Sequence, residues 1–265
     1  MSRILQYPFS TFLGFQNFFR FVVIIFMLIG VLFLEPPTKV ELEKNNLPIF
    51  SEEAILGTDR LGRDNFSLFT YGMVSTMILV VPARALTILV SLLLSLLVVF
   101  LPKWTEILWS GISSVFLSVP SLLVALICIG MFPDFRFVVI LSILLSDWAL
   151  AFETISAKIR ELQKSGYLVS SKTMGATNLL IFRLHYISAL STILKFLFVS
   201  GLPSVVMTVA LFSYLGVDVS MFSFGPGLGE QIAFSKDYFD KTPASILLPI
   251  FGILILIYIL GTKEK

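Results

Sequence analysis

The stretch VSTMILVVPARALTILVSLLLSLLVVFL, residues 74–101, is apolar along its whole length and holds a single charged residue, Arg84. A helix of about 20 apolar residues is long enough to cross the roughly 30 Å hydrocarbon core of a bilayer. Because this stretch is longer than that, a crossing helix would tilt or include an interfacial turn. We therefore predict a transmembrane helix at this place in the chain.

The rest of the sequence is also rich in apolar runs. Of its 265 residues, 57% are hydrophobic and only 14% are charged, and the mean hydropathy is +0.95. A single crossing would not use this much apolar sequence. The runs between charges and Pro or Gly breaks predict an all-α membrane protein with six transmembrane helices, at about Phe19–Leu34, Val74–Leu101, Ser110–Phe132, Phe135–Ala157, Leu190–Tyr214 and Pro243–Leu260.

The positions of Lys and Arg indicate the orientation of these spans. Six spans place both termini on one side, and that side carries more Lys and Arg than the other, whose loops hold most of the carboxylates. Because basic residues mark cytoplasmic loops, we predict that both termini face the cytoplasm. This gives an interfacial N-terminal segment (1–18), a first span with an external loop (19–73), and a core of five spans (74–265) with a cytoplasmic loop at about 158–189.

The composition argues against several other functions. The net charge is only +2 and the basic residues are dispersed, so no nucleic-acid partner is expected. The sequence has one cysteine, Cys128, and one histidine, His185, which excludes a Cys/His metal cage within the chain. It also lacks a Walker motif and a Ser/His/Asp set. We expect no catalytic residue, no metal site and no cofactor in this chain.

The segment GTDRLGRDNF, residues 57–66, has the glycine spacing of a phosphate-binding loop. Such a loop needs Lys and then Ser or Thr after the second glycine, but Arg63 and Asp64 occupy those places. We therefore expect a structural segment in which charged side chains pair locally and the glycines allow a turn. Its residues are Gly57, Thr58, Asp59, Arg60, Gly62, Arg63 and Asp64.

The long basic segment AKIRELQKSGYLVSSKTMGATNLLIFRLHYIS, residues 157–188, is too polar to span a membrane. Its apolar residues predict two short helices that break at Gly175, with Thr177 or Asn178 capping the second helix. Two interpretations fit this pattern equally. The helix pair presents a knob to a cytosolic partner, or it is an amphipathic hairpin that rests on the lipid headgroups.

Two charges, Arg84 and Asp147, fall deep inside the predicted spans, where charged side chains are costly and mark functional sites. At 1.5 Å per residue both lie roughly 15 to 18 Å below the outer ends of their spans. We expect them to face a pathway, as a mutual ion pair or as contacts for the zwitterionic ends of a peptide. The alternative is that Arg84 reaches the outer surface along its aliphatic stem.

Two of these motifs together resemble one family. ILGTDRLGRDNFSLFTYG, residues 55–72, is similar to the signature of the OppC/DppC/NikC-type permeases, the inner-membrane subunits of ABC importers for peptides and nickel. GYLVSSKTMGATNLLIFRLHYIS, residues 166–188, resembles the EAA loop of the same family. Further similar segments include FLSVPSLLVAL and ALFSYLGV, so the resemblance covers nearly the whole chain from Leu34 onward.

The resemblance implies the type I ABC importer permease fold in the inner membrane, with the EAA segment as a coupling helix. It implies a second homologous permease, two cytosolic ATPases that bind ATP and magnesium, and an external substrate-binding protein. This chain would then be a transport subunit without enzymatic activity. The coupling positions would be Tyr167, Leu168, Val169, Ser170, Ser171, Met174, Gly175 and Ala176.

The sequence departs from the family pattern at three places in this loop. Val169 replaces the motif glutamate, Ser170 and Ser171 replace its two alanines, and Ser188 replaces its later proline. Without the glutamate, docking would depend more on shape and apolar contact. The main alternative function is a self-sufficient secondary transporter or channel, which would show inverted repeats with matched broken helices. An intramembrane enzyme would need paired catalytic groups, and only Arg84 and Asp147 approach this.

Overall fold

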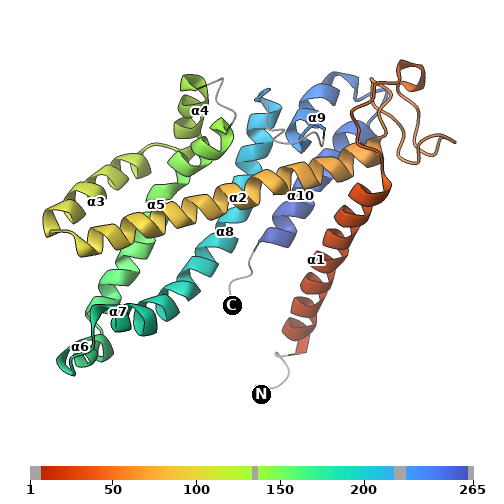
Figure 1. Ribbon diagram of the computed structural model, residues 1–265. Helices are drawn as coiled ribbons and strands as arrows, with labels where there is room; N and C mark the ends of the chain where they lie inside the picture. Colours follow the sequence, from red (N-terminus) through yellow and green to blue (C-terminus); the bar gives the residue numbers. More distant parts are fainter. Residues whose placement is uncertain (1–6, 133–136, 218–224, 262–265) are drawn as a thin grey trace. The chain divides into compact units, whose positions relative to one another are not determined.

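The computed structural model describes residues 7–132, 137–217 and 225–261, and these are helical apart from loops and one isolated β-bridge (Figure 1). The all-α prediction is therefore confirmed for this part of the chain. The helices are α1 Tyr7–Phe33, α2 Asn65–Phe100, α3 Lys103–Ser118, α4 Ser121–Met131, α5 Val138–Gln163, α6 Gly166–Thr173, α7 Asn178–Ile181, the π-helix Phe182–Tyr186, α8 Ile187–Tyr214, α9 Leu228–Ser235 and α10 Ala244–Leu260, with short 3-10 turns at Leu42–Lys44 and Lys236–Tyr238.

Three helices of the described residues are long and apolar enough to cross a membrane. They are Asn65–Val98, Val138–Gln163 and Phe182–Tyr214, and the bent pair α3 and α4 makes a fourth candidate if it counts as one span. Phe18–Phe33 and Ala244–Leu260 are apolar but shorter. The structure thus gives three to four candidate spans, and the count of six stays a prediction.

The predicted third span, about Ser110–Phe132, is not a continuous helix. It is divided between α3 and α4, whose axes differ by 95°. The break lies at Val119 and Pro120, where Val119 has extended backbone angles (φ −99°, ψ 132°). Proline lacks an N–H group and disfavours helical geometry in the residue before it. Pro120 therefore divides the predicted span into α3 and α4.

The chain divides into two compact units. The first consists of residues up to Val80 and from Val206 onward, and the second of Val81–Val205. Helices α2 and α8 each contribute one part to each unit. The three-segment division drawn from the sequence rests on predicted topology and stays a prediction.

Polar side chains join the elements of the first unit. Arg20 of α1 donates from Nε to the carbonyl of Ile259 at 2.6 Å and from Nη2 to that of Gly261 at 2.7 Å. A cation is favourable at this place because the last carbonyls of α10 lack helical partners. Gln231 of α9 donates to the carbonyl of Leu68 in α2 at 2.7 Å. These contacts hold α1, α2, α9 and α10 in one body.

Helix α5 is the centre of the second unit. Its buried face includes Trp148, Phe152 and Ile155. Two serines of α2 bond to α5 carbonyls: Ser91 Oγ to Trp148 O at 3.0 Å and Ser95 Oγ to Phe152 O at 3.2 Å. Small hydroxyl side chains let the two backbones approach closely, as in membrane helix interfaces. Helix α2 therefore joins α5 through serine hydrogen bonds as well as through the apolar clusters that Ile88 and Val98 share with α5.

Candidate functional site

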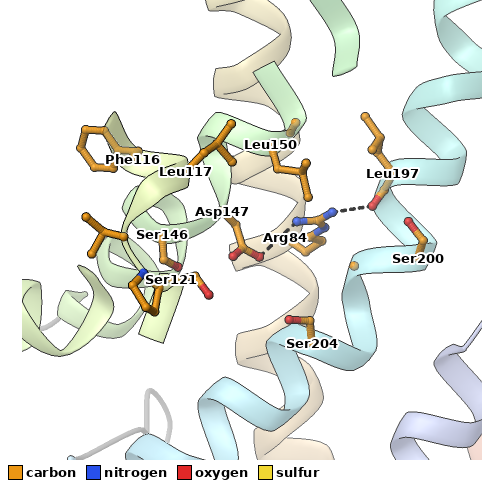
Figure 2. A pocket seen from close by; sticks show the side chains of 14 residues that line it. Arg84, Phe116, Leu117, Ser121, Ser146, Asp147, Leu150, Leu197, Ser200 and Ser204 are labelled. Atoms are coloured by element: carbon orange, nitrogen blue, oxygen red, sulfur yellow. Dashed lines mark hydrogen bonds and ion pairs between the residues drawn. The ribbon is translucent and has the colours of Figure 1, made fainter. Parts of the chain in front are cut away.

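A cavity of about 450 Å³ lies within the second unit and is lined by residues of α2, α3, α4, α5 and α8 (Figure 2). Arg84 of α2 and Asp147 of α5 meet there, with 3.3 Å between Arg84 Nη1 and Asp147 Oδ2. The structure thus brings together the two charges that the sequence placed at similar depth. Whether they line a transport pathway is still a prediction.

Burial distinguishes the two members of this ion pair. The Arg84 side chain is 7% exposed and that of Asp147 is 22% exposed. Arg84 is therefore enclosed by protein and does not reach out along its stem. Its Nη2 donates to the carbonyl of Leu197 in α8 at 2.6 Å, while its Nε is buried without a hydrogen-bond partner. A guanidinium has five N–H donors, so this one is only partly satisfied.

Gly201 of α8 makes room for the Arg84 guanidinium. A Cβ atom built on Gly201 would lie 2.1 Å from both Cζ and Nη2 of Arg84. Any larger residue at this position would push the guanidinium away from the Leu197 carbonyl. The position of Arg84 therefore depends on a glycine of α8, which lies one turn beyond Leu197 on that helix.

A second carboxylate within the predicted spans was not singled out from the sequence. Glu153 lies in the predicted fourth span, two turns of α5 beyond Asp147. Its Oε1 accepts hydrogen bonds from Ser110 at 3.1 Å and from Ser113 of α3. Arg160 lies 3.8 Å from Glu153 and 3.0 Å from Glu106. This network joins α3 to α5. Its only signal in the sequence was that Glu153 lies seven residues before Arg160 on one helix.

The basic segment, residues 157–188, forms the two short helices that were predicted. Gly175 has φ +81°, and the N–H of Ala176 bonds to the carbonyl of Ser171 at 3.0 Å, which is the C-terminal arrangement that favours glycine. Thr177 Oγ1 accepts a hydrogen bond from the N–H of Leu180 at 3.3 Å and so caps α7. Of the two predicted cap residues, Thr177 is the one that makes this bond.

The predicted coupling positions divide into buried and exposed residues. Leu168 is fully buried in a cluster with Leu162 of α5 and Ile181 of α7. Met174 is 77% exposed, and Tyr167 and Val169 are both 49% exposed. Helix α6 therefore packs against α5 and α7 through a buried leucine while it presents apolar side chains outward. The structure does not bring all eight positions onto one surface.

His185 helps to hold α6 in place. Its Nε2 lies 3.0 Å from Ser171 Oγ, and its ring centroid lies 5.2 Å from that of Tyr167. His185 belongs to the π-helix Phe182–Tyr186, which continues into α8. The serine that replaces a motif alanine thus has a hydrogen-bonding role inside this segment.

The segment Gly57–Asp64 builds a tight turn before α2. Asp59 pairs with Arg63, with 2.7 Å between Oδ2 and Nη2, and its Oδ1 accepts from the N–H of Leu61 and of Arg63 at 2.9 Å each. Asp64 Oδ2 accepts from the N–H of Ser67 at 3.0 Å and caps α2. Arg60 does not pair with a carboxylate here; its Cζ lies 3.5 Å from the centre of the Phe234 ring.

Both glycines of this segment have left-handed backbone angles. Gly57 has φ +69° and Gly62 has φ +75°. A Cβ on Gly62 would lie 1.8 Å from the carbonyl oxygen of Glu41. Thr58 adds a further tie, since its Oγ1 accepts from the N–H of Leu47 at 2.9 Å and donates to the Lys44 carbonyl. This geometry explains the two glycines without a nucleotide.

Comparison with curated proteins gives several relatives. The oligopeptide transport system permease protein OppC of Bacillus subtilis (strain 168) is 27% identical over 170 residues, which cover 64% of this chain and 55% of that protein. The di/tripeptide transport system permease protein DppC of Pseudomonas aeruginosa (strain UCBPP-PA14) is 28% identical over 211 residues, 78% of this chain and 67% of that protein. The chain is a distant homologue of OppC and DppC permease subunits.

A third relative aligns with a still larger share of this chain. The dipeptide transport system permease protein DppC of Alkalihalophilus pseudofirmus (strain ATCC BAA-2126 / JCM 17055 / OF4) is 22% identical over 215 residues, 80% of this chain and 69% of that protein. No family model matches the chain. The match to the Bacillus subtilis OppC spans little more than half of that relative's length. The relatives are permease subunits, which are transport components and not enzymes.

The remaining chemistry of this permease homologue agrees with a transport component. Among the described residues, no group of three or more His, Cys, Asp or Glu side chains could hold a metal ion. Cys128 is buried in α4. Arg84 and Asp147 pair with each other, and Glu153 accepts hydrogen bonds from serines. The absence of a cofactor stays an expectation.

Proposed function

We propose that the chain is a permease subunit of an ABC importer and forms half of a translocation pathway for peptides, or for nickel or related small solutes. The proposal is carried by the distant homology to OppC and DppC subunits, which extends over 64% to 80% of the chain. Peptides come first among the solutes because these relatives are named for oligopeptide, di/tripeptide and dipeptide transport.

In this proposal the chain crosses the inner membrane six times, with both termini in the cytoplasm. The three long apolar helices and the bent pair of α3 and α4 supply four crossings. Helix α1 and the 17-residue α10 supply the other two, α10 by lying close to the membrane normal. The other components are a second homologous permease, two cytosolic ATPases that bind ATP and magnesium, and an external substrate-binding protein.

Helix α6 is the coupling helix of the proposed transporter. The exposed apolar side chains Tyr167 and Val169 of α6, with Met174 directly after the helix, supply the contact with an ATPase. A valine stands where the motif has glutamate, so this contact depends on shape and burial of apolar surface. Leu168 is buried against α5 and α7. A movement of α6 is therefore passed directly to the core of the second unit.

Co-purification tests this proposal. The full chain, tagged at its C-terminus, is extracted from its own cells with a mild detergent, and the proteins bound to it are identified by mass spectrometry. A second permease and at least one ATPase should accompany it. Recovery of the chain alone, together with solute uptake that persists when ATP is depleted but a proton gradient is kept, would instead favour a secondary transporter.

A matched pair of variants adds a control. Met174→Asp places a charge at the exposed position directly after α6, and Met131→Asp does the same at the end of α4, where the methionine is 66% exposed. We expect the first variant to lose the ATPase during purification and the second to retain it. Loss of the ATPase in both variants would indicate general damage and not a specific coupling surface.

A further inference from the structure

The ion pair in the cavity of the second unit is incomplete as an ion pair. Arginine and a carboxylate usually form two parallel hydrogen bonds, but here the contact is single, from Nη1 to Oδ2 at 3.3 Å. Arg84 Nε has no partner although it is buried. The guanidinium therefore has unused donor capacity, and one more pair of acceptor atoms would complete it.

The surroundings of the pair are shaped for a polar guest. Ser121 of α4, Ser146 of α5, and Ser200 and Ser204 of α8 line the same cavity as Arg84 and Asp147 (Figure 2). Leu150, Phe116 and Leu117 form its apolar side. A few placed polar groups within a largely apolar wall are typical of small-molecule sites. Neither the sequence motifs nor the names of the relatives draw attention to this cavity.

We propose that this cavity binds a small zwitterionic solute, such as a free dipeptide, with its carboxylate on Arg84 and its ammonium group on Asp147. The proposal rests on the proposed function and names the class of solute that this subunit recognises. Both charges, on Arg84 and on Asp147, are needed to bind the solute. A zwitterion that separates the pair gives each buried charge a new partner, whereas a neutral or singly charged solute leaves at least one of them unpaired.

The size of the cavity limits the length of the solute. About 450 Å³ lies in the lower part of the usual range for small-molecule pockets, roughly 300 to 1,000 Å³. An extended peptide spans about 3.3 to 3.6 Å per residue, so the charged ends of a dipeptide lie roughly 7 Å apart. The Arg84–Asp147 contact must therefore open when the solute enters. Asp147 is the more exposed member, and it has the freedom to swing.

Cysteine labelling tests this proposal in native membranes with the full chain. Cys128 is the only cysteine of the sequence, so Cys128→Ala gives a chain without thiols. Ser204→Cys then places a reporter on the cavity wall, and Ser200→Cys is a second reporter one turn away. We measure the rate at which a small water-soluble thiol reagent labels each reporter, with and without dialanine.

Dialanine should slow labelling about tenfold at a concentration roughly ten times its Kd, because only unoccupied protein reacts. N-acetyl-dialanine amide, which is neutral, should give no protection. N-acetyl-dialanine and dialanine amide, with one charge each, should protect less than dialanine. Equal protection by the neutral and zwitterionic compounds would overturn the proposal, and so would the failure of the reagent to reach either reporter.

Variants of the ion pair complete the test. Arg84→Gln and Asp147→Asn should each abolish protection by dialanine. Glu153→Gln is the matched control, because it also removes a carboxylate from α5 but lies outside the cavity lining; it should keep the protection. Thermal unfolding of each variant identifies any that does not fold. If a variant does not fold, the comparison of dialanine with its analogues, in protein that keeps both Arg84 and Asp147, decides the outcome. Protection that survives in folded Arg84→Gln and Asp147→Asn would refute the proposal.

The result can be separated from that of the proposed function. If an ATPase co-purifies with the chain but dialanine does not protect the reporters, only the assignment of the cavity fails. If dialanine protects the reporters but no ATPase or second permease is recovered, the cavity is a zwitterion site in a different kind of transporter.

Discussion

Substituting Gly201 by alanine tests how Arg84 is held in the cavity. In an unconstrained helix this change stabilises a protein, because alanine has about 1 kcal/mol higher helix propensity than glycine. Here the new Cβ would lie 2.1 Å from Arg84 Cζ and Nη2, so the guanidinium must move. Its bond to the Leu197 carbonyl, 2.6 Å in length, would then be lost.

The two effects have opposite signs, and their sizes decide the outcome. A hydrogen bond from a charged group contributes about 1.5 to 3 kcal/mol, and the propensity gain offsets about 1 kcal/mol of that loss. We therefore expect Gly201→Ala to lower the free energy of unfolding by about 0.5 to 2 kcal/mol. The flexible end of Arg84 can shift, so the full cost of a backbone clash does not apply.

Denaturant unfolding of the purified protein in detergent measures this difference. Gly111→Ala in α3 is the matched control, because a Cβ there meets no atom within 4 Å and α3 should gain stability. Opposite signs for the two variants are expected. If Gly201→Ala is as stable as Gly111→Ala, Arg84 is not held against α8 in the way described.

Three further changes test the loops and the coupling segment. Asp64→Ala removes the cap of α2 and should lower stability by about 0.5 to 2 kcal/mol, measured by the same unfolding experiment; Asp64→Ser, which can still cap, should retain most of it, and equal losses would contradict the capping role. Gly62 has φ +75°, and a Cβ at this position would lie 1.8 Å from the carbonyl oxygen of Glu41. Gly62→Ala should therefore lower the free energy of unfolding by more than about 1 kcal/mol, and an unchanged unfolding midpoint would refute this. Leu168→Ala leaves a cavity at a fully buried site and should lower the free energy of unfolding by about 2 to 5 kcal/mol. It should also uncouple ATP hydrolysis from uptake. Val169 is exposed, so Val169→Ala should change the free energy of unfolding by no more than about 0.5 kcal/mol.

Local rules predicted the turns and caps of this chain well. Gly175 with Thr177, and Gly57 with Gly62, act through backbone geometry that depends only on near neighbours, so their sequence signal is direct. The similar depth of Arg84 and Asp147 was also predictable, because the fixed rise of a helix gives the depth of each residue in its span. These features did not require knowledge of the tertiary packing.

Other features depended on packing and were missed. The angle of 95° between α3 and α4, on either side of Pro120, was not predicted. Glu153 is partnered by serines of another helix, which no local pattern reveals. In the coupling segment, an eight-residue helix is too short for its periodicity to separate Leu168, which is buried, from Val169, which is exposed. The carbonyl of Leu197 and the space at Gly201 likewise appear only when α2 and α8 are packed together.

The central claim is that a separate motor acts on this chain through α6. Photo-cross-linking measures this contact most directly, with a light-activated side chain at Met174, the most exposed of the coupling positions, and at Met131 as the matched control. The account predicts that the probe at Met174 attaches to an ATPase subunit and that the probe at Met131 does not. Attachment of the Met174 probe to lipid alone would contradict it, and would instead place α6 as a hairpin on the membrane surface.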